Sequence, residues 1–150
     1  ENKLRLFNDF EFNQDLARNK LYTDSISFSG KHCVFTHKNK KYGPVYSLKP
    51  DEINFNELRG VIVKGKFLCQ SKVHEETAII IETITNSPNE KRIWKGIPIS
   101  SFSVSPNNWS EFKIPFSFPQ EIKKALELKV YLFNPTEQKV FLDDFELLIK

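Results

Sequence analysis

The chain has 150 residues, of which 39% are hydrophobic and 27% are charged, with 8 Pro and only 5 Gly. A chain of this length is expected to form one domain, residues 1–150, and the composition excludes long disorder, collagen-like repeats and coiled coil. No apolar run approaches the roughly 18 residues that a membrane-spanning helix requires, so we expect no membrane span.

The formal net charge is +3, and the basic residues comprise 18 Lys and 4 Arg. Proteins that bind nucleic acids favour Arg, because its guanidinium group makes paired contacts with bases and phosphates. The basic residues are also scattered along the chain. We therefore expect no nucleic-acid partner.

Several segments alternate between apolar and polar residues or are short apolar runs, as in β-strands. In chain order, the predicted elements are a strand at 25–36, a hairpin turn at 39–43, a turn at 51–58, strands at 61–69 and 78–85, a turn at 86–91, strands at 93–99 and 109–118, a short helix or helical turn at 119–126, and strands at 129–134 and 140–149. Closely spaced strands with almost no helix predict an antiparallel β-sandwich or barrel.

The last predicted strand contains a carboxylate in an apolar row. Alternation places Asp143 on the same face as Phe141 and Phe145. A carboxylate there must be hydrogen-bonded, paired with a base, or bound to a metal such as calcium, which prefers oxygen ligands. If the first and last strands are neighbours, Glu11 and Asp143 could share one ion; the alternative is that Asp9, Glu11 and Asp144 are solvated.

A resemblance to a known superfamily rests on short motifs in order along the chain. They are NDFE at 8–11, a strand with Ser29 and Gly30, Trp109 three residues before Phe112, KVYLFN at 129–134 and VFLDDFEL at 140–147. This pattern resembles the galactose-binding-like jelly-roll superfamily, and in particular carbohydrate-binding modules that begin with N-x-D-F-E and end with a D-D strand.

The resemblance implies an all-β sandwich of jelly-roll type with about eight strands, and chain ends on neighbouring strands. It also implies a structural calcium bound by Glu11, by the backbone near 30–32, and by Asp143 or alternatively Asp144. Related modules often have a Trp soon after the Glu, whereas this chain has no Trp before Trp94, and Leu21 and Tyr22 are the apolar candidates for that place. An extracellular, cell-surface or periplasmic location is expected, with other domains of a parent chain as partners.

Aromatic residues decide whether such a module binds a polysaccharide or other glycan, because sugar rings stack their C–H faces on Trp and Tyr. We predict that Trp94, Tyr42, Tyr46 and Tyr131 form the carbohydrate-binding site, with Tyr42 and Tyr46 in or beside a turn. Trp109 is expected to be structural.

Other chemistry has little support in the sequence. The three His residues have no zinc-site spacing, and no nucleophile or phosphate-loop motif is present, so we expect no enzyme. Cys33 and Cys69 form no CxxC, and both a disulfide and buried free thiols stay open. The main alternative function is a structural or protein-interaction domain of a larger surface protein, without a sugar site.

Overall fold

The computed structural model describes residues 4–11, 22–23, 27–30, 32–86, 92–119, 122 and 124–150. The elements in these ranges are β1 (Leu4–Asn8), β2 (Tyr22–Thr23), β3 (Cys33–Thr36), β4 (Tyr42–Leu48), β5 (Gly60–Cys69), β6 (Ala78–Ile84), β7 (Trp94–Pro98), the 3-10 helix η1 (Ile99–Phe102), β8 (Ser110–Ser117), β9 (Glu127–Phe133) and β10 (Val140–Ile149).

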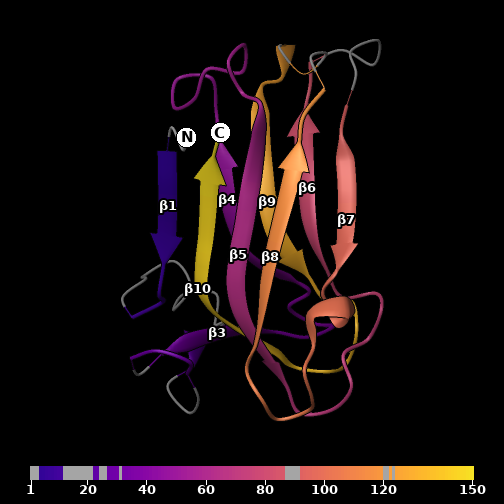
Figure 1. Ribbon diagram of the computed structural model, residues 1–150. Helices are drawn as coiled ribbons and strands as arrows, with labels where there is room; N and C mark the ends of the chain where they lie inside the picture. The colour runs from indigo at the N-terminus through magenta and orange to yellow at the C-terminus, as the bar shows by residue number, and fades with distance from the viewer. Residues whose placement is uncertain are drawn as a thin grey trace.

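The strands form two antiparallel sheets packed face to face (Figure 1). A six-stranded sheet has the order β2-β3-β10-β5-β8, with β1 also paired to β10. A four-stranded sheet has the order β4-β9-β6-β7. The predicted antiparallel sandwich is therefore confirmed.

The first and last strands are neighbours, as expected. β1 pairs antiparallel with β10, from Leu4 opposite Ile149 to Asn8 opposite Phe145. The N-terminal and C-terminal ends of the described chain consequently lie at the same end of the sandwich (Figure 1).

The main core fills the space between the sheets with alternate residues of the long strands. Its largest fully buried members include Phe67, Phe112, Phe145, Ile79, Leu128 and Leu142. Because inward residues alternate with outward ones, the outer faces of both sheets are free to carry other chemistry.

The pattern missed three strands, β1, β2 and β4, and overextended another. The strand predicted at 25–36 is regular only over β3, and residues 25, 26 and 31 lie outside the described part. β4 was predicted as a turn followed by loop, because Gly43 and Pro44 interrupt the alternation. The chain absorbs these two residues as an irregularity in the β4–β9 register, between Tyr42 and Val45.

The structure describes all of the predicted turn at 51–58 and part of the predicted helical turn at 119–126. The turn at 51–58 is confirmed by hydrogen bonds from the N–H groups of Glu52 and Ile53 to the carbonyl of Lys49. In the segment at 119–126, Ala125 donates its N–H to the carbonyl of Ile122 at 2.8 Å, which makes a helical turn. Residues 120, 121 and 123, like 87–91 of the predicted turn, lie outside the described part.

A β-bulge corrects the expected faces of β10. The β10–β5 register shifts between Asp143 and Glu146, and Asp144 has a φ of 48°. Such an extra residue reverses the inward and outward alternation beyond it. Asp143 therefore shares its outward face with Phe141, whereas Phe145 points into the main core.

Both cysteines are buried thiols, and they lie in different clusters. Cys69 belongs to the core between the sheets, and Cys33 packs with Leu68 and Phe141 on the outer face of the six-stranded sheet. Burial raises the pKa of each thiol to about 12, with Asp143 and Glu11 adding to the effect at Cys33. Of the two alternatives, the structure shows buried thiols and not a disulfide.

Among the described residues, no helix is long and apolar enough to cross a membrane.

Candidate functional site

The outer face of the four-stranded sheet is unusually apolar, although no other layer of the described residues covers it. Strand register aligns Val45, Tyr131, Ile80 and Gly96 across β4, β9, β6 and β7. The adjacent row contains Tyr42, Phe133, Ala78 and Pro98. Ile80, Ala78 and Tyr131 are at most 9% exposed and form a small buried cluster, so the accessible apolar surface lies at the edges of these rows. Outward positions of a solvated sheet are normally polar, which makes this apolar face a candidate binding face. We call it the aromatic face.

Aromatic rings at two edges of this face remain accessible. Trp94 on β7 is 60% exposed, and Tyr42 on β4 is 53% exposed. Tyr42 contacts two rings on β9, with centroids 6.0 Å from Tyr131 and 5.4 Å from Phe133. Three of the four aromatic residues predicted as a sugar site therefore share one face.

Gly96 provides the place where the Trp94 indole rests. A Cβ atom at Gly96 would lie 3.1 Å from Cη2 and 3.3 Å from Cζ3 of Trp94, and 3.4 Å from Cδ1 of Ile80. The six-membered ring of Trp94 thus reaches over Gly96 because that position has no side chain. The sequence does not reveal this role, because a single glycine within a strand does not show which side chain packs against it.

A buried carboxylate lies beside Trp94. Glu82 on β6 is directly opposite Trp94, and its Oε1 accepts a hydrogen bond from the Tyr131 hydroxyl at 3.3 Å. Its Oε2 is 3.5 Å from Nη2 of Arg92, forming an ion pair. Burial, together with the nearby Glu82 charge, raises the pKa of Tyr131 to about 12, which keeps the phenol protonated and able to donate.

A second polar group lies farther along the same face. The Ser47 hydroxyl donates to Oε2 of Glu127 at 2.5 Å, and Oε1 of Glu127 is 3.7 Å from Nζ of Lys129. The face therefore combines an apolar aromatic half with a half that carries paired charges and hydroxyls. Such a surface can stack flat apolar ring faces and hydrogen-bond the polar groups at their edges.

Tyr46 lies on the other side of its strand from the aromatic face. The irregularity between Tyr42 and Val45 turns Val45 outward and Tyr46 inward. The Tyr46 hydroxyl donates to the Phe145 carbonyl at 2.5 Å, and the two rings stack with centroids 5.0 Å apart. Burial and the Glu146 charge raise the pKa of Tyr46. This tyrosine joins the two sheets and does not offer a surface for stacking.

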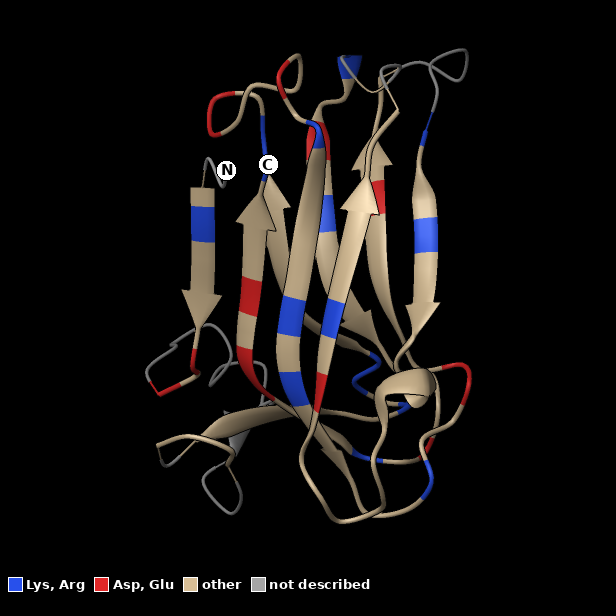
Figure 2. Cartoon of the chain, viewed as in Figure 1, with Lys and Arg blue, Asp and Glu red and all other residues tan. Residues whose placement is uncertain are grey.

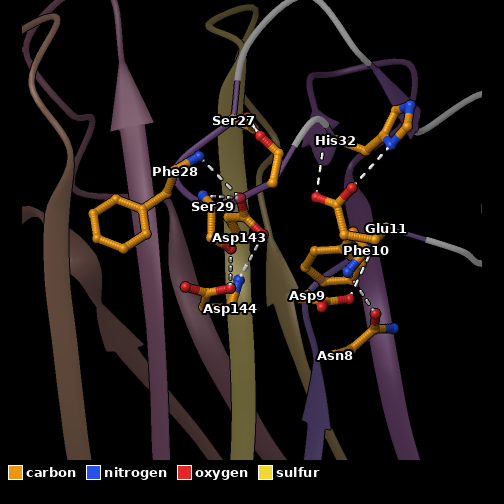
Figure 3. Close-up of polar contacts among 11 residues, drawn as sticks. Asn8, Asp9, Phe10, Glu11, Ser27, Phe28, Ser29, His32, Asp143 and Asp144 are labelled. Carbon is orange, nitrogen blue, oxygen red and sulfur yellow. Dashed lines mark hydrogen bonds and ion pairs between the residues drawn. The ribbon is translucent and has the colours of Figure 1, made fainter.

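The predicted metal residues lie together at the far end of the six-stranded sheet from the termini, around the bulge (Figure 3). Asp143 is fully buried, and its Oδ2 accepts from the N–H groups of Phe28 and Ser29 at 2.9 and 3.0 Å. Its Oδ1 accepts from the Asp144 N–H at 2.8 Å. Asp144 in turn accepts from the Ser29 hydroxyl at 2.6 Å. Among the possibilities for Asp143, hydrogen bonding is the one observed.

Burial raises the pKa of Asp143, and the backbone hydrogen bonds act in the opposite direction to a smaller extent. The three N–H donors therefore do not fully offset the cost of removing this carboxylate from water.

Glu11 makes separate contacts at the same end of the sheet. Its Oε1 accepts from the His32 N–H at 3.1 Å, and its Oε2 is 3.2 Å from Nδ1 of His32 (Figure 3). The carboxylate also fills the space next to Gly30, which has a φ of 60° and would have no room there for a Cβ atom. Glu11 and Asp143 thus each hold a different part of the 27–32 segment.

In the structure, the contacts of these carboxylates are hydrogen bonds. N–H groups, which repel a cation, point at oxygen atoms of both Glu11 and Asp143. In the ranges that the structure describes, no group of three or more His, Cys, Asp or Glu side chains could hold a metal ion. Of the backbone predicted to contribute, Lys31 lies outside those ranges.

A second row of apolar residues crosses the outer face of the six-stranded sheet. It consists of Phe35, Phe141, Leu68 and Trp109, and Phe28 contacts Trp109 with ring centroids 5.7 Å apart. Trp109 is therefore structural on an outer face, in a small cluster apart from the main core.

Two rings at this second row, Phe35 and its neighbour Phe28, have one of the chain's own cations over them, as Tyr42 on the aromatic face has Lys41 at 5.7 Å. Lys139 lies over the Phe35 ring at 5.3 Å, and Lys66 lies over the Phe28 ring at 5.2 Å. Beyond the row, charged residues gather along the middle of β5, β8 and β10 (Figure 2). This face is less suited to stacking sugar rings than the aromatic face.

Two hollows lie beside the 51–58 turn, one lined by Leu4, Leu58 and Ile149 and the other by Phe55 and Ala125. Their volumes are about 210 and 200 Å³. Ligand pockets usually exceed ~300 Å³. The aromatic face is therefore the better candidate.

Comparison with known proteins agrees with the fold. No protein-family model matches the chain, and no curated protein matches it in sequence. Among solved structures, the chain is similar to the CBM22-1 xylan-binding domain of Paenibacillus barcinonensis Xyn10C, with 16% identity, a TM-score of 0.59, and coverage of 96% of this chain and 92% of that one.

Two further structures extend this likeness. A xylan-binding domain from CBM 22, also described as x6b, has 12% identity and a TM-score of 0.62, over 96% of this chain and 93% of that one. The CBM22-1-GH10 modules of Clostridium thermocellum xylanase Xyn10B, complexed with xylohexaose, have 12% identity and a TM-score of 0.57, over 85% of this chain and 23% of that one. At these identities the likeness shows a shared fold, the β-sandwich of carbohydrate-binding modules.

Proposed function

We propose that this chain is a non-catalytic carbohydrate-binding module that holds a linear polysaccharide on its aromatic face. The main observation in support is that Trp94, Tyr131 and Tyr42 lie on one outward face, bordered by the Glu82–Arg92 ion pair. Fold alone is a poor guide to function, so the proposal depends on this arrangement of side chains.

The likeness to xylan-binding domains makes xylan the first ligand to test. In the xylanase Xyn10B structure, such a domain occurs with a GH10 module. We propose accordingly that this module acts outside the cell and brings an attached domain of a parent chain to its polysaccharide.

The test is a binding screen of the purified protein against soluble xylans, glucans, mannans and acidic polysaccharides. We expect saturable binding to a neutral linear polysaccharide that survives moderate salt, because stacking and hydrogen bonding are screened little by ions. Binding to acidic polymers alone, lost in salt, would contradict the proposal. If a folded sample binds none of the polysaccharides, the structural or protein-interaction alternative would be favoured.

Gly96→Val is predicted to lower polysaccharide affinity by roughly tenfold, because the added side chain displaces the Trp94 ring from its position. Titration calorimetry and the fluorescence of Trp94 would measure the change. Lys95→Val is the matched control, since it places the same side chain on the next residue of β7, directed away from the aromatic face. Equal losses in both variants would show that altering β7 itself weakens binding.

Calcium binding by Glu11, Asp143 and Asp144 stays a prediction from the resemblance. The N–H donors around these carboxylates support a site that is held without an ion. We therefore expect the melting temperature to be the same in excess chelator and in millimolar calcium. An increase of several degrees in calcium, absent in Glu11→Gln, would establish the ion and require these donors to rearrange.

A further inference from the structure

The ion pair beside Trp94 has an arrangement that ordinary surface ion pairs lack. The side chain of Glu82 is only 11% exposed, whereas that of Arg92 is 60% exposed. Glu82 also lies between Trp94 and Lys129 in the sheet register. The contacts of Glu82 hold its nearly buried carboxylate in one position. A carboxylate in a fixed position is better suited to binding a ligand than to keeping the protein soluble.

Both members of the pair have hydrogen-bonding capacity left. A carboxylate has about four lone-pair positions and a guanidinium five N–H donors. Glu82 uses one position for the Tyr131 hydroxyl at 3.3 Å and another for Arg92 at 3.5 Å. An acceptor and a donor therefore lie side by side at the sheet position opposite Trp94.

We propose that Glu82 and Arg92 recognise a vicinal diol, that is, two free hydroxyl groups on adjacent carbons of a pyranose ring. This inference rests on the proposed function. A sugar stacked on Trp94 directs its equatorial hydroxyls outward from the ring edge. One hydroxyl donates to the Glu82 carboxylate, and its neighbour accepts from the Arg92 guanidinium.

The pairing of charges narrows the ligand class further. Glu82 neutralises Arg92, and Glu127 neutralises Lys129, so the described polar half of the face has no surplus cation. Lys41, 5.7 Å from the Tyr42 ring centroid, adds one positive charge at the aromatic edge, which is too little to select an acidic polymer. The ligand is therefore a neutral polysaccharide with free adjacent hydroxyls, such as a 1,4-linked xylan or glucan. A 1,3-linked glucan, whose linkage uses the hydroxyl between two others, is excluded.

The experiment compares deacetylated xylan with the same preparation after acetylation of its adjacent hydroxyls. We expect the protein to bind the deacetylated form at least ~10-fold more tightly, the effect of hydrogen bonds to charged groups. Glu82→Gln and Arg92→Gln should each remove most of this preference. Arg59→Gln, at an exposed arginine outside the aromatic face, should keep it.

A second comparison uses 1,4-linked and 1,3-linked gluco-oligosaccharides of equal length, and melting temperatures establish that each variant is folded. Equal binding of the acetylated and free forms, with binding still lost in Trp94→Ala, would overturn the diol inference and leave the proposed function in place. Absence of binding to every form by the folded wild type would overturn the proposed function itself.

Discussion

Trp94→Ala is expected to reduce polysaccharide affinity by roughly 30-fold or more, which corresponds to about 2 kcal/mol or more of binding free energy. Trp94 offers the largest exposed aromatic surface on the aromatic face, and binding a sugar ring would bury it. Because the indole is 60% exposed, its removal should change stability little. Titration calorimetry with the polysaccharide identified in the screen measures the effect.

Phe28→Ala is the matched control for this prediction. Phe28 is 47% exposed, so a comparable aromatic ring is removed, but it lies over the outer face of the opposite sheet. Its affinity should stay within about twofold of the wild type. If Phe28→Ala weakens binding as much as Trp94→Ala, the ligand does not lie on the aromatic face.

The sandwich was predictable because most of its strands alternate regularly. β5, β6, β8 and β10 each fall within a predicted segment to within one residue. β4 was missed because the Gly43–Pro44 step is typical of turns. These two residues belong to a strand because β4 pairs with β9. This pairing is a long-range interaction, so the local sequence pattern does not predict it.

The two irregular registers also account for the errors in side-chain direction. Tyr46 points inward because of the step in β4, and Phe145 points into the core, away from the face of Asp143, because of the bulge in β10. A one-residue shift moves every later side chain to the opposite face. The adjacent acidic residues hinted at the bulge, since Asp tolerates the left-handed backbone that Asp144 adopts.

The signal for Glu82 was present in the sequence. Glu82 alternates with Ile80 and Ile84 in a predicted strand, which is the same pattern of a carboxylate in an apolar row that drew attention to Asp143. Its partner could not be predicted, because Tyr131 lies 49 residues away and meets Glu82 only through the β6–β9 pairing. The positions of Trp94, Tyr42 and Tyr131 on one face depend on three strand pairings, β4–β9, β6–β9 and β6–β7.

Asn134→Ala is expected to destabilise the fold by about 3–5 kcal/mol and to lower the melting temperature by roughly 10 °C. Asn134 is fully buried between the end of β9 and the start of β10. Its amide donates to the carbonyls of Thr36 and Gln138 at 3.1 and 2.7 Å. Its carbonyl accepts from the hydroxyls of Thr77 and Thr136 at 3.2 and 2.6 Å.

Alanine would leave these buried groups unpaired, and an unsatisfied buried polar group costs more than an average hydrogen bond contributes. Urea unfolding gives the free energy, with Asn108→Ala as control. Asn108 also donates to a hydroxyl and a carbonyl, those of Ser105 and Pro106, but in an exposed loop where water replaces the lost bonds. The control should change stability by less than ~0.5 kcal/mol. Equally small effects of both substitutions would mean that Asn134 does not join β3, β6 and the β9–β10 connection as these contacts require.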